Sequence, residues 1–342
     1  MKFLIPFSML FSLHAEISML PLAQGKYDPN QTVVWSPLWH SAWLAQQEKS
    51  PEDNQEAIHE LQNLMLPFAD KAAANALEAD HILISGNDDA TLYEKANDES
   101  GKRWQFRPFA KKSTAKDPDR AILAILHKTF YFKVPFERAQ SIPLPFVAVD
   151  GATDVQFFGT ANGDKFPHVK VLNHDPILRT QALQIPGRNA EESAILYTPE
   201  KNCSFFDACA TLRPLIKACA EAKGEAREPF AFHSDDTILI PYVALHVSTD
   251  FAPFLRENKS LHTTSAIQKV FLQMDQIGTK YSYGSYQYYH SGGDPFGQDL
   301  DAKGRNFHYF QPFFLMLWHR NAEWPYLAVW LGDSSALQHW KD

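Results

Sequence analysis

Apolar and polar residues alternate along residues 265–277, a pattern typical of a β-strand whose side chains point in turn to the two faces of a sheet. The alternation stops at Gly278-Thr279, and no strand pattern follows until the apolar run 313–318. Residues 121–133 form another apolar stretch of the kind found in buried strands. The pattern therefore predicts a long strand, a long connection without strands, and a return into a buried sheet.

Helical spacing dominates the first half of the chain, and strand patterns dominate the second. After the opening Ser50-Pro51-Glu52-Asp53, apolar residues recur at helical spacing: Ile58, Leu61, Leu64, Met65 and Phe68. Further strands are expected at 149–159, 168–173, 183–200, 238–255 and 325–333. Helices followed by strands that must pair over long distances in the sequence predict the α+β class with a mixed sheet.

A helix is predicted to begin just after residue 35. Ser36 can serve as its N-cap, and Pro37 fits the first helical position. Tryptophans recur at i, i+4 and i+8 across its start, and this stripe is expected to pack in the core: Trp35, Trp39 and Trp43.

Three cysteines lie close together in the sequence: Cys203, Cys209 and Cys219. Their number is odd and their spacings fit no zinc pattern, so two could form a disulfide in an oxidising compartment and leave one free. Cys219 shares a helix face with Leu215 and Ile216, which predicts the role of a small buried hydrophobe. Pro214 can start this helix and Gly224 can stop it.

Composition argues against several functions. The 342 residues carry a formal net charge of −8 without a cluster of Lys and Arg, which argues against nucleic acid or an anionic membrane surface as partner. No apolar run reaches the ~18 residues of a membrane-spanning helix. No Gly-x-Ser-x-Gly segment or phosphate loop occurs, and His168, His174 and Asp175 match no closed metal site. We therefore expect no catalytic residue, no metal and no cofactor.

The first 15 residues have the pattern of a secretion signal. Lys2 precedes an apolar core at 3–13, and Ala15 is a small residue at the expected cleavage site, with Ala23 as a second candidate. The alternative is that these residues form an N-terminal helix of the fold. We expect residues 1–15 to be removed and the protein to be secreted, into an extracellular or periplasmic space.

Six segments resemble motifs of the serpin family and follow its order: 32–45, 121–136, 183–200, 238–255, 265–285 and 325–333. In the second segment, Tyr131, Phe132 and Lys133 occupy the places that serpins give to Tyr-Phe-Lys, and Pro312-Phe313 opens the return strand. The resemblance implies one domain over 16–342, with helices on a large mixed sheet A, smaller sheets B and C, and an exposed reactive loop at 279–311. It also implies that 121–133 and 265–277 lie in the same sheet. The core of the sheets is expected to include Phe130, Phe132, Ile195, Leu196, Val270, Leu272, Leu315, Leu317, Leu327 and Val329.

The chain is shorter than serpins between Pro37 and Phe132 and between Pro241 and Gly278. Each deficit is large enough to remove a helix of ~11 residues. Residues 89–119 are polar and charged where serpins carry a helix across the front of the large sheet. The resemblance therefore implies a reduced serpin, and leaves this helix open.

Serpins inhibit proteases as single-use traps, because the loop inserts into the sheet after the protease has cut it. By resemblance, Gly278 is the fifteenth residue before the scissile bond and Thr279 is acceptably small. Tyr281 and Tyr283 would face inward on insertion, where overpacking typically costs ~1–3 kcal/mol per site. Gln276 replaces the family's acidic residue.

Three positions that help a serpin sheet to open also differ from the family pattern. Lys128 stands in the place of a buried asparagine, and Gln268 in the place of its histidine partner on the neighbouring strand. Phe136 replaces a tryptophan. These changes favour a serpin fold without the trap.

The resemblance does not settle the scissile bond, because the loop is longer than usual. Counting from the hinge and counting back from Pro312 give two different bonds, Gly292-Gly293 and Asp301-Ala302. Basic residues would suit a trypsin-like protease and aromatic residues a chymotrypsin-like one: Lys303 and Arg305, or Tyr289 and Phe296.

Two functions of different class follow. The first is a secreted inhibitor of serine-type or cysteine endopeptidases that acts by loop bait and insertion. The second is a non-inhibitory binding protein that presents a Tyr- and Gly-rich loop to a protein partner. Both imply a monomer whose partner, a protease or another protein, binds the loop.

Overall fold

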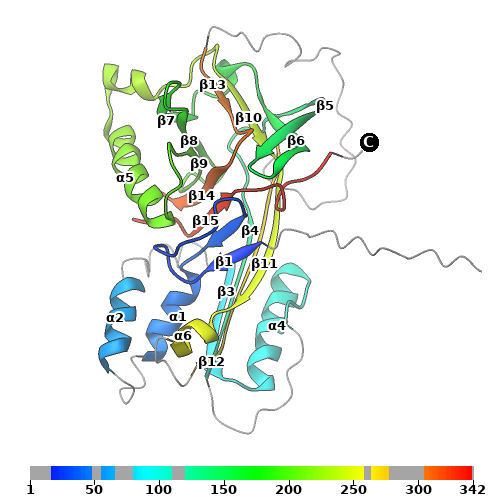
Figure 1. Cartoon of the computed structure of the whole chain (residues 1–342), viewed down its shortest axis with the longest axis vertical. Helices are drawn as coiled ribbons and strands as arrows, with labels where there is room; N and C mark the ends of the chain where they lie inside the picture. Colours follow the sequence, from blue (N-terminus) through cyan, green and yellow to red (C-terminus); the bar gives the residue numbers. More distant parts are fainter. Residues whose placement is uncertain are drawn as a thin grey trace, which may run out of the picture.

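The computed structural model describes residues 17–47, 55–65, 80–109, 120–257, 263–276 and 304–340. These residues form three β-sheets with helices on their outer faces (Figure 1). The predicted α+β class, with three sheets, is confirmed. The sheet with most strands lies in the middle of the molecule, and the other two adjoin it.

The first sheet has seven strands. In spatial order they are β1 (Ser18–Leu20), β2 (Val33–Trp35), β15 (Leu327–Leu331), β14 (Phe313–His319), β9 (Glu192–Thr198), β8 (Thr180–Pro186) and β7 (Lys170–Asp175). Every residue of β14 and β15 is buried. Helix α5 (Phe205–Glu221) covers one face, where its Phe205 and Leu212 join the same apolar cluster as Phe314 of β14.

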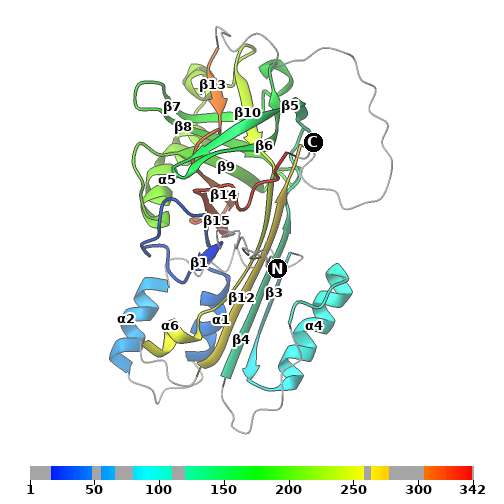
Figure 2. The same ribbon diagram turned by 45° about the vertical axis from the view of Figure 1, so that its right-hand side comes forward.

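The second sheet carries the two strands with which the sequence pattern began. Its order is β11 (Val243–Asp250), β12 (Thr263–Met274), β4 (Arg120–Thr129) and β3 (His81–Asn87). Strands β12 and β4 are direct parallel neighbours, so the prediction that 121–133 and 265–277 share a sheet is confirmed. Figure 2 shows α4 (Ala90–Trp104) on one side of these strands, and on the other side α1 (Leu38–Gln47), α2 (Gln55–Met65) and α6 (Ala252–Glu257).

The third sheet lies at the end of the molecule away from α2 and α6 (Figure 1). Its order is β13 (Asn306–His308), β10 (Thr237–Pro241), β6 (Gly151–Thr160) and β5 (Glu137–Ala148), with the short helices η2 (Gly163–Lys165) and η3 (Gly224–Phe230) nearby. All ten core residues expected from the sequence are buried, as are the three tryptophans of the predicted stripe.

The helix that the sequence left open is present as α4. Asp89 caps it, because its carboxylate accepts a hydrogen bond from the Leu92 N–H, and it ends at Gln105, whose φ is 62°. The helix buries Leu92, Tyr93 and Ala96 against the sheet, and its other face is charged. Its polar composition therefore belongs to the exposed face of an amphipathic helix.

Other local predictions need correction. Pro214 lies inside α5 and does not start it; the helix begins behind Ser204, whose hydroxyl accepts a hydrogen bond from the Asp207 N–H. The Ser36 hydroxyl donates to the Tyr326 carbonyl at 2.9 Å, and α1 begins at Leu38, one residue after the predicted Pro37. All three cysteines are free thiols. Cys209 is the fully buried one, while Cys219 packs at the margin of the core.

Candidate functional site

The candidate site is the junction between β12 and β4. The two strands pair directly from Thr263 and Arg120 to Gln273 and Thr129, with one irregularity near Thr263. Because they are parallel neighbours, a strand that followed β12 and turned back would enter between them antiparallel to both. The chain leaves β12 toward residues 277–303, which lie outside the described residues, and reappears at Gly304.

Gln276, the first residue of the predicted hinge, is held by two hydrogen bonds. The Gln276 carbonyl accepts from the Phe136 N–H at 2.8 Å, and its side-chain Oε1 accepts from the Tyr242 hydroxyl. Phe136 is 4% exposed and stacks on Phe166 at 4.6 Å, next to Phe132 at 5.0 Å. Two of the predicted positions, Gln276 and Phe136, therefore lie together at the top of β12.

The other predicted hinge residues, Gly278, Thr279, Tyr281 and Tyr283, lie outside the described residues. So do most of the candidate cleavage positions: Tyr289, Gly292, Gly293, Phe296, Asp301, Ala302 and Lys303.

Lys128 is the centre of a buried ion-pair network. Its side chain is 5% exposed, and its Nζ lies 2.5 Å from Asp80 Oδ2 and 2.9 Å from Glu192 Oε1. Glu192 is the first residue of β9, so this network ties β4 to the seven-stranded sheet. The ammonium also lies 5.7 Å from the ring centroid of Tyr326, whose phenol pKa is raised by burial and by the nearby carboxylates of Glu192 and Asp80.

Gln268 is fully buried on β12, and neither atom of its side-chain amide has a hydrogen-bond partner among the described residues. Its cross-strand neighbours are Ala124 on β4 and Thr249 on β11. Lys128 pairs instead with Leu272, four residues further along β12. The structure therefore does not bring Lys128 and Gln268 together as cross-strand partners.

Arg305 is anchored in the fold. Its backbone N–H and its Nε donate to Asp236 Oδ1 at 2.9 and 3.1 Å, and its Nη2 donates to Asp236 Oδ2 at 2.6 Å and to the Ala231 carbonyl at 2.5 Å. Burial alone would raise the pKa of Asp236, but the hydrogen bonds from Arg305 and His233 outweigh it and lower that pKa. A protease needs an extended, accessible segment, so these contacts disfavour Arg305 as the cleavage position.

The predicted loop therefore ends earlier than expected. Residues 306–308 form β13 in parallel pairing with β10, and Phe307 and Tyr309 are buried. The alternation of buried and partly exposed residues over 306–309 is a strand pattern, too short to stand out in the sequence. The segment 304–311, which the sequence assigned to the loop, belongs to the sheets and the turn before β14.

Sequence reasoning missed the partners of the site. Asp80 and Glu192 are 48 and 64 residues from Lys128 in the sequence, and no spacing rule connects them. Tyr242 and Asp236 were missed for the same reason. The only available signal was the lysine itself, since an ammonium at a buried strand position requires a carboxylate nearby.

The architecture of three sheets, with a closed β12–β4 junction from which the chain departs, defines the serpin fold. Comparison with solved structures agrees. The chain is similar to serpin-12 of Manduca sexta at 12% identity, covering 90% of this chain and 94% of that one with a TM-score of 0.59. It is also similar to the thermophilic serpin Tengpin, at 13% identity, 90% of both chains and a TM-score of 0.59.

A third solved structure, maspin, matches at 12% identity over 89% of this chain and 92% of that one, with a TM-score of 0.60. No protein-family model and no curated protein matches the sequence. At identities this low, the likeness establishes the fold alone. None of the helices in the described residues is long and apolar enough to cross a membrane.

Proposed function

We propose that this protein is a secreted protease inhibitor that presents the segment after Gln276 to a serine-type endopeptidase as bait. The observation that carries the proposal is the direct parallel pairing of β12 with β4, because one strand antiparallel to both could pair with each of them if the two parted. The fold likeness to serpins supports it.

The proposed reaction is an interrupted proteolysis. The serine hydroxyl of the protease attacks a peptide bond within 279–303, the new amino end leaves, and the acyl group stays on the protease as an ester. The part of the loop attached to β12 then inserts between β12 and β4. To admit it, β4 must move away from β12 by about one strand spacing, ~4.8 Å.

The Lys128–Glu192 ion pair opposes this opening. β4 would move while β9 stays in the seven-stranded sheet, so the 2.9 Å contact between Lys128 Nζ and Glu192 Oε1 must break. Breaking a buried pair costs ~3–5 kcal/mol. An inserted strand as long as β4, which has 10 residues, would replace the lost β12–β4 hydrogen bonds and add a second set of similar size. At ~1 kcal/mol net per added bond, this gain exceeds the cost of breaking the ion pair. The ion pair would therefore slow insertion without preventing it.

The second candidate function is a non-inhibitory binding protein that presents the same segment to a protein partner. The buried network of Lys128 favours it, because each contact that resists opening slows insertion, while the rate at which water hydrolyses the acyl-enzyme stays the same. Tyr281 and Tyr283 favour it as well, since phenol side chains would have to enter a packed core.

Export is part of the proposal. The secretion-signal pattern covers residues 1–15, and β1 begins at Ser18 and pairs with β2 in the seven-stranded sheet. Cleavage after Ala23 would remove β1, so cleavage after Ala15 is the better fit to the fold.

The test is incubation with trypsin-, chymotrypsin- and elastase-like proteases. A complex that survives boiling in detergent, with the wild-type chain but not with Thr279→Arg, is the expected result, because a charge at the hinge cannot be buried cheaply. As a second readout, the protein nicked in the loop should melt at a clearly higher temperature than the intact one.

Cleavage within 279–303 without a trapped complex, in both the wild-type chain and Tyr281→Ala/Tyr283→Ala, would sink the inhibitor proposal. An unchanged melting temperature after nicking in both proteins would point the same way. The second function would then lead.

A further inference from the structure

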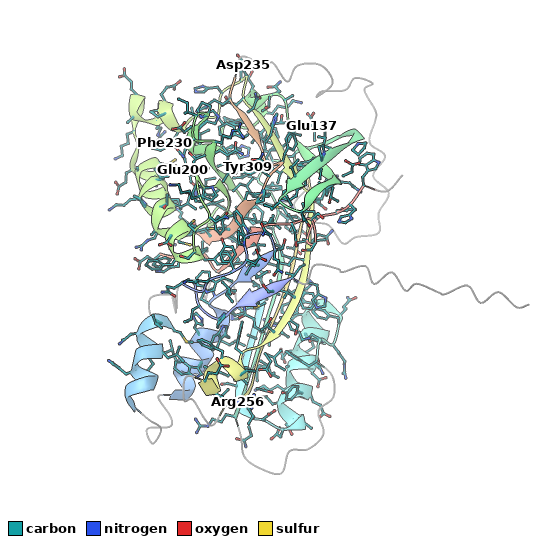
Figure 3. All side chains as sticks on the ribbon, viewed as in Figure 1. Glu137, Glu200, Phe230, Asp235, Arg256 and Tyr309 are labelled. Carbon is teal, nitrogen blue, oxygen red and sulfur yellow. The ribbon has the colours of Figure 1, made fainter. Side chains whose placement is uncertain are left out.

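A polar cavity of about 970 Å³ opens between the turn that joins β7 to β8 and the edge of β13. Its walls include His174, Arg179 and Gln181 on one side and Asp235, Asn306 and His308 on the other. Figure 3 labels Asp235 at the end of the molecule opposite to α6. The volume is at the upper end of the range of ligand pockets.

One wall is the free edge of a β-strand. Among the described strands, β13 pairs only with β10. The Arg305 carbonyl accepts from the Thr237 N–H at 3.0 Å, and the Tyr309 N–H donates to the Leu239 carbonyl at 2.9 Å. Because alternate residues of a strand direct their backbone groups to opposite sides, the N–H and C=O groups of residues 306 and 308 point away from β10.

A side-chain amide already occupies one acceptor of this edge. Gln181 Nε2 donates to the His308 carbonyl at 3.2 Å, as the N–H of a neighbouring strand would. The His308 carbonyl therefore faces the cavity, and an N–H of a docking strand would replace the Gln181 amide at this acceptor. The backbone groups of Asn306 and the His308 N–H have no comparable partner among the described residues.

Both walls are fixed before any ligand arrives. The carboxylate of Asp236 holds Arg305 and with it the start of β13. On the opposite wall, Asp175 Oδ1 accepts hydrogen bonds from the backbone N–H groups of Ile177 and Leu178 at 2.9 and 3.0 Å, which fixes the turn. A preformed groove saves the ordering cost that a mobile site would impose on binding.

The two arginines that line the cavity differ in whether a carboxylate neutralises their charge. The charge of Arg305 is neutralised by Asp236, whereas Arg179 is exposed and forms no ion pair or hydrogen bond through its side chain with the described residues. Its backbone φ of 55° is uncommon outside glycine and fixes the direction in which the side chain leaves the turn, while the exposed guanidinium stays free to adjust to a ligand. The unpaired guanidinium suits a carboxylate. Asp235 offers an acceptor for amide N–H groups on the other wall.

We propose that this cavity is a docking groove for an extended segment of a partner protein, which adds to the free edge of β13 and places an acidic side chain against Arg179. With only three residues in β13, the segment forms few backbone hydrogen bonds, so binding is in the micromolar range, about 10–100 μM. The proposal does not depend on protease inhibition, since the groove is built from residues outside 277–303.

The experiment is a fluorescence-anisotropy titration of the whole chain with a labelled acetyl-Thr-Val-Thr-Glu-Val amide peptide. We expect saturable binding, and Arg179→Asn should weaken it at least about fivefold, because asparagine tolerates the positive φ but carries no charge. Arg256→Asn on α6, which Figure 3 labels at the opposite end of the molecule, is the matched control and should bind like the wild type.

Two further measurements test strand addition itself. A peptide methylated on its two valine amide nitrogens should lose binding, and hydrogen exchange at the amides of Asn306 and His308 should slow when the unmodified peptide binds. The proposal is overturned if the peptide does not saturate below about 1 mM, or if Arg179→Asn behaves like Arg256→Asn. Equal binding of the methylated peptide, or full protection of both amides in the free protein, would overturn it too.

Discussion

The seven-stranded sheet and the four-stranded sheet formed by β11, β12, β4 and β3 meet in the middle of the molecule and differ in how their strands are buried. Strands β14 and β15 are buried along their whole length and form apolar contacts on both faces. Along most of β12, buried and partly exposed residues alternate. The four-stranded sheet also buries Lys128 and Gln268, which are polar.

This difference separates a sheet that must stay closed from one that could open. Parting β14 from its neighbours would expose apolar surface at ~25 cal/mol per Å², with nothing to replace the lost contacts. Parting β12 from β4 breaks backbone bonds that a new strand could restore on both sides. Under the proposed function, the buried polar groups beside that junction would set how readily it opens.

The largest expected effect tests the ion-pair network. Lys128→Met should lower the free energy of unfolding by about 3–5 kcal/mol, because Glu192 is left as a buried charge without its partner. Urea unfolding monitored by tryptophan fluorescence measures it. The double variant Lys128→Met/Glu192→Gln should recover part of the loss, because it also removes the unpaired negative charge of Glu192.

The control for this effect is an exposed ion pair of the same chemistry. Lys165 and Glu137 lie 2.7 Å apart with side chains 58% and 42% exposed, so Lys165→Met should change stability by less than about 1 kcal/mol. Equal losses in Lys128→Met and Lys165→Met would show that the network contributes nothing special to the four-stranded sheet.

The second prediction concerns acid. His40 is fully buried on α1, and its Nε2 lies 2.7 Å from the Pro21 carbonyl, which assigns the Nε2–H as donor and ties α1 to the segment after β1. Burial lowers the pKa of His40 to about 4, although the Pro21 carbonyl opposes the shift. Between pH 6.5 and 4 the unfolded chain binds a proton that the folded chain does not, so stability falls as pH falls through this range.

The expected loss from His40 is about 3 kcal/mol between pH 7 and pH 4, and the loss levels off below about pH 3. Burial also lowers the pKa of His168 and His308 to about 4, so the comparison with His40→Gln isolates one residue. The variant keeps a hydrogen-bond donor and does not titrate. Parallel loss of stability in wild type and variant, in urea titrations at matched pH, would contradict the assignment.

Much of the architecture could be predicted from the sequence because strand patterns and the order of motifs are local. The prediction that 121–133 and 265–277 lie in the same sheet is confirmed, whereas their direct parallel pairing was not predicted. Strand β5, however, was missed: it contains Pro143 and Pro145, and prolines argue against a strand unless it lies at an edge, which is where β5 lies. Helix α4 was left open because its charged face outweighed its apolar one in the composition.

The candidate site was predictable only as single positions. Lys128, Phe136 and Gln268 were singled out by resemblance, but the carboxylates that satisfy Lys128 come from distant parts of the chain. The anchoring of Arg305 by Asp236 likewise joins residues 69 apart in the sequence. Such partners depend on how the sheets stack, which no short pattern encodes.

The smallest and most discriminating prediction concerns Gln268. Its amide is fully buried, and neither polar atom has a partner among the described residues, so the folded state carries a desolvation cost of about 1–3 kcal/mol. Gln268→Met keeps the length of the side chain and removes the polar atoms, and should raise the free energy of unfolding by about 1–2 kcal/mol.

Gln184→Met on β8 of the seven-stranded sheet is the matched control, because Gln184 Nε2 donates to Ser193 Oγ at 3.2 Å and only that bond would be lost. Urea unfolding of both variants decides the matter. If Gln268→Met destabilises as much as Gln184→Met does, a bound water satisfies the Gln268 amide and the four-stranded sheet is better satisfied than its protein contacts indicate. If only Gln268→Met stabilises, the buried Gln268 amide lowers the stability of the sheet that is proposed to open, at a position on β12 directly beside β4.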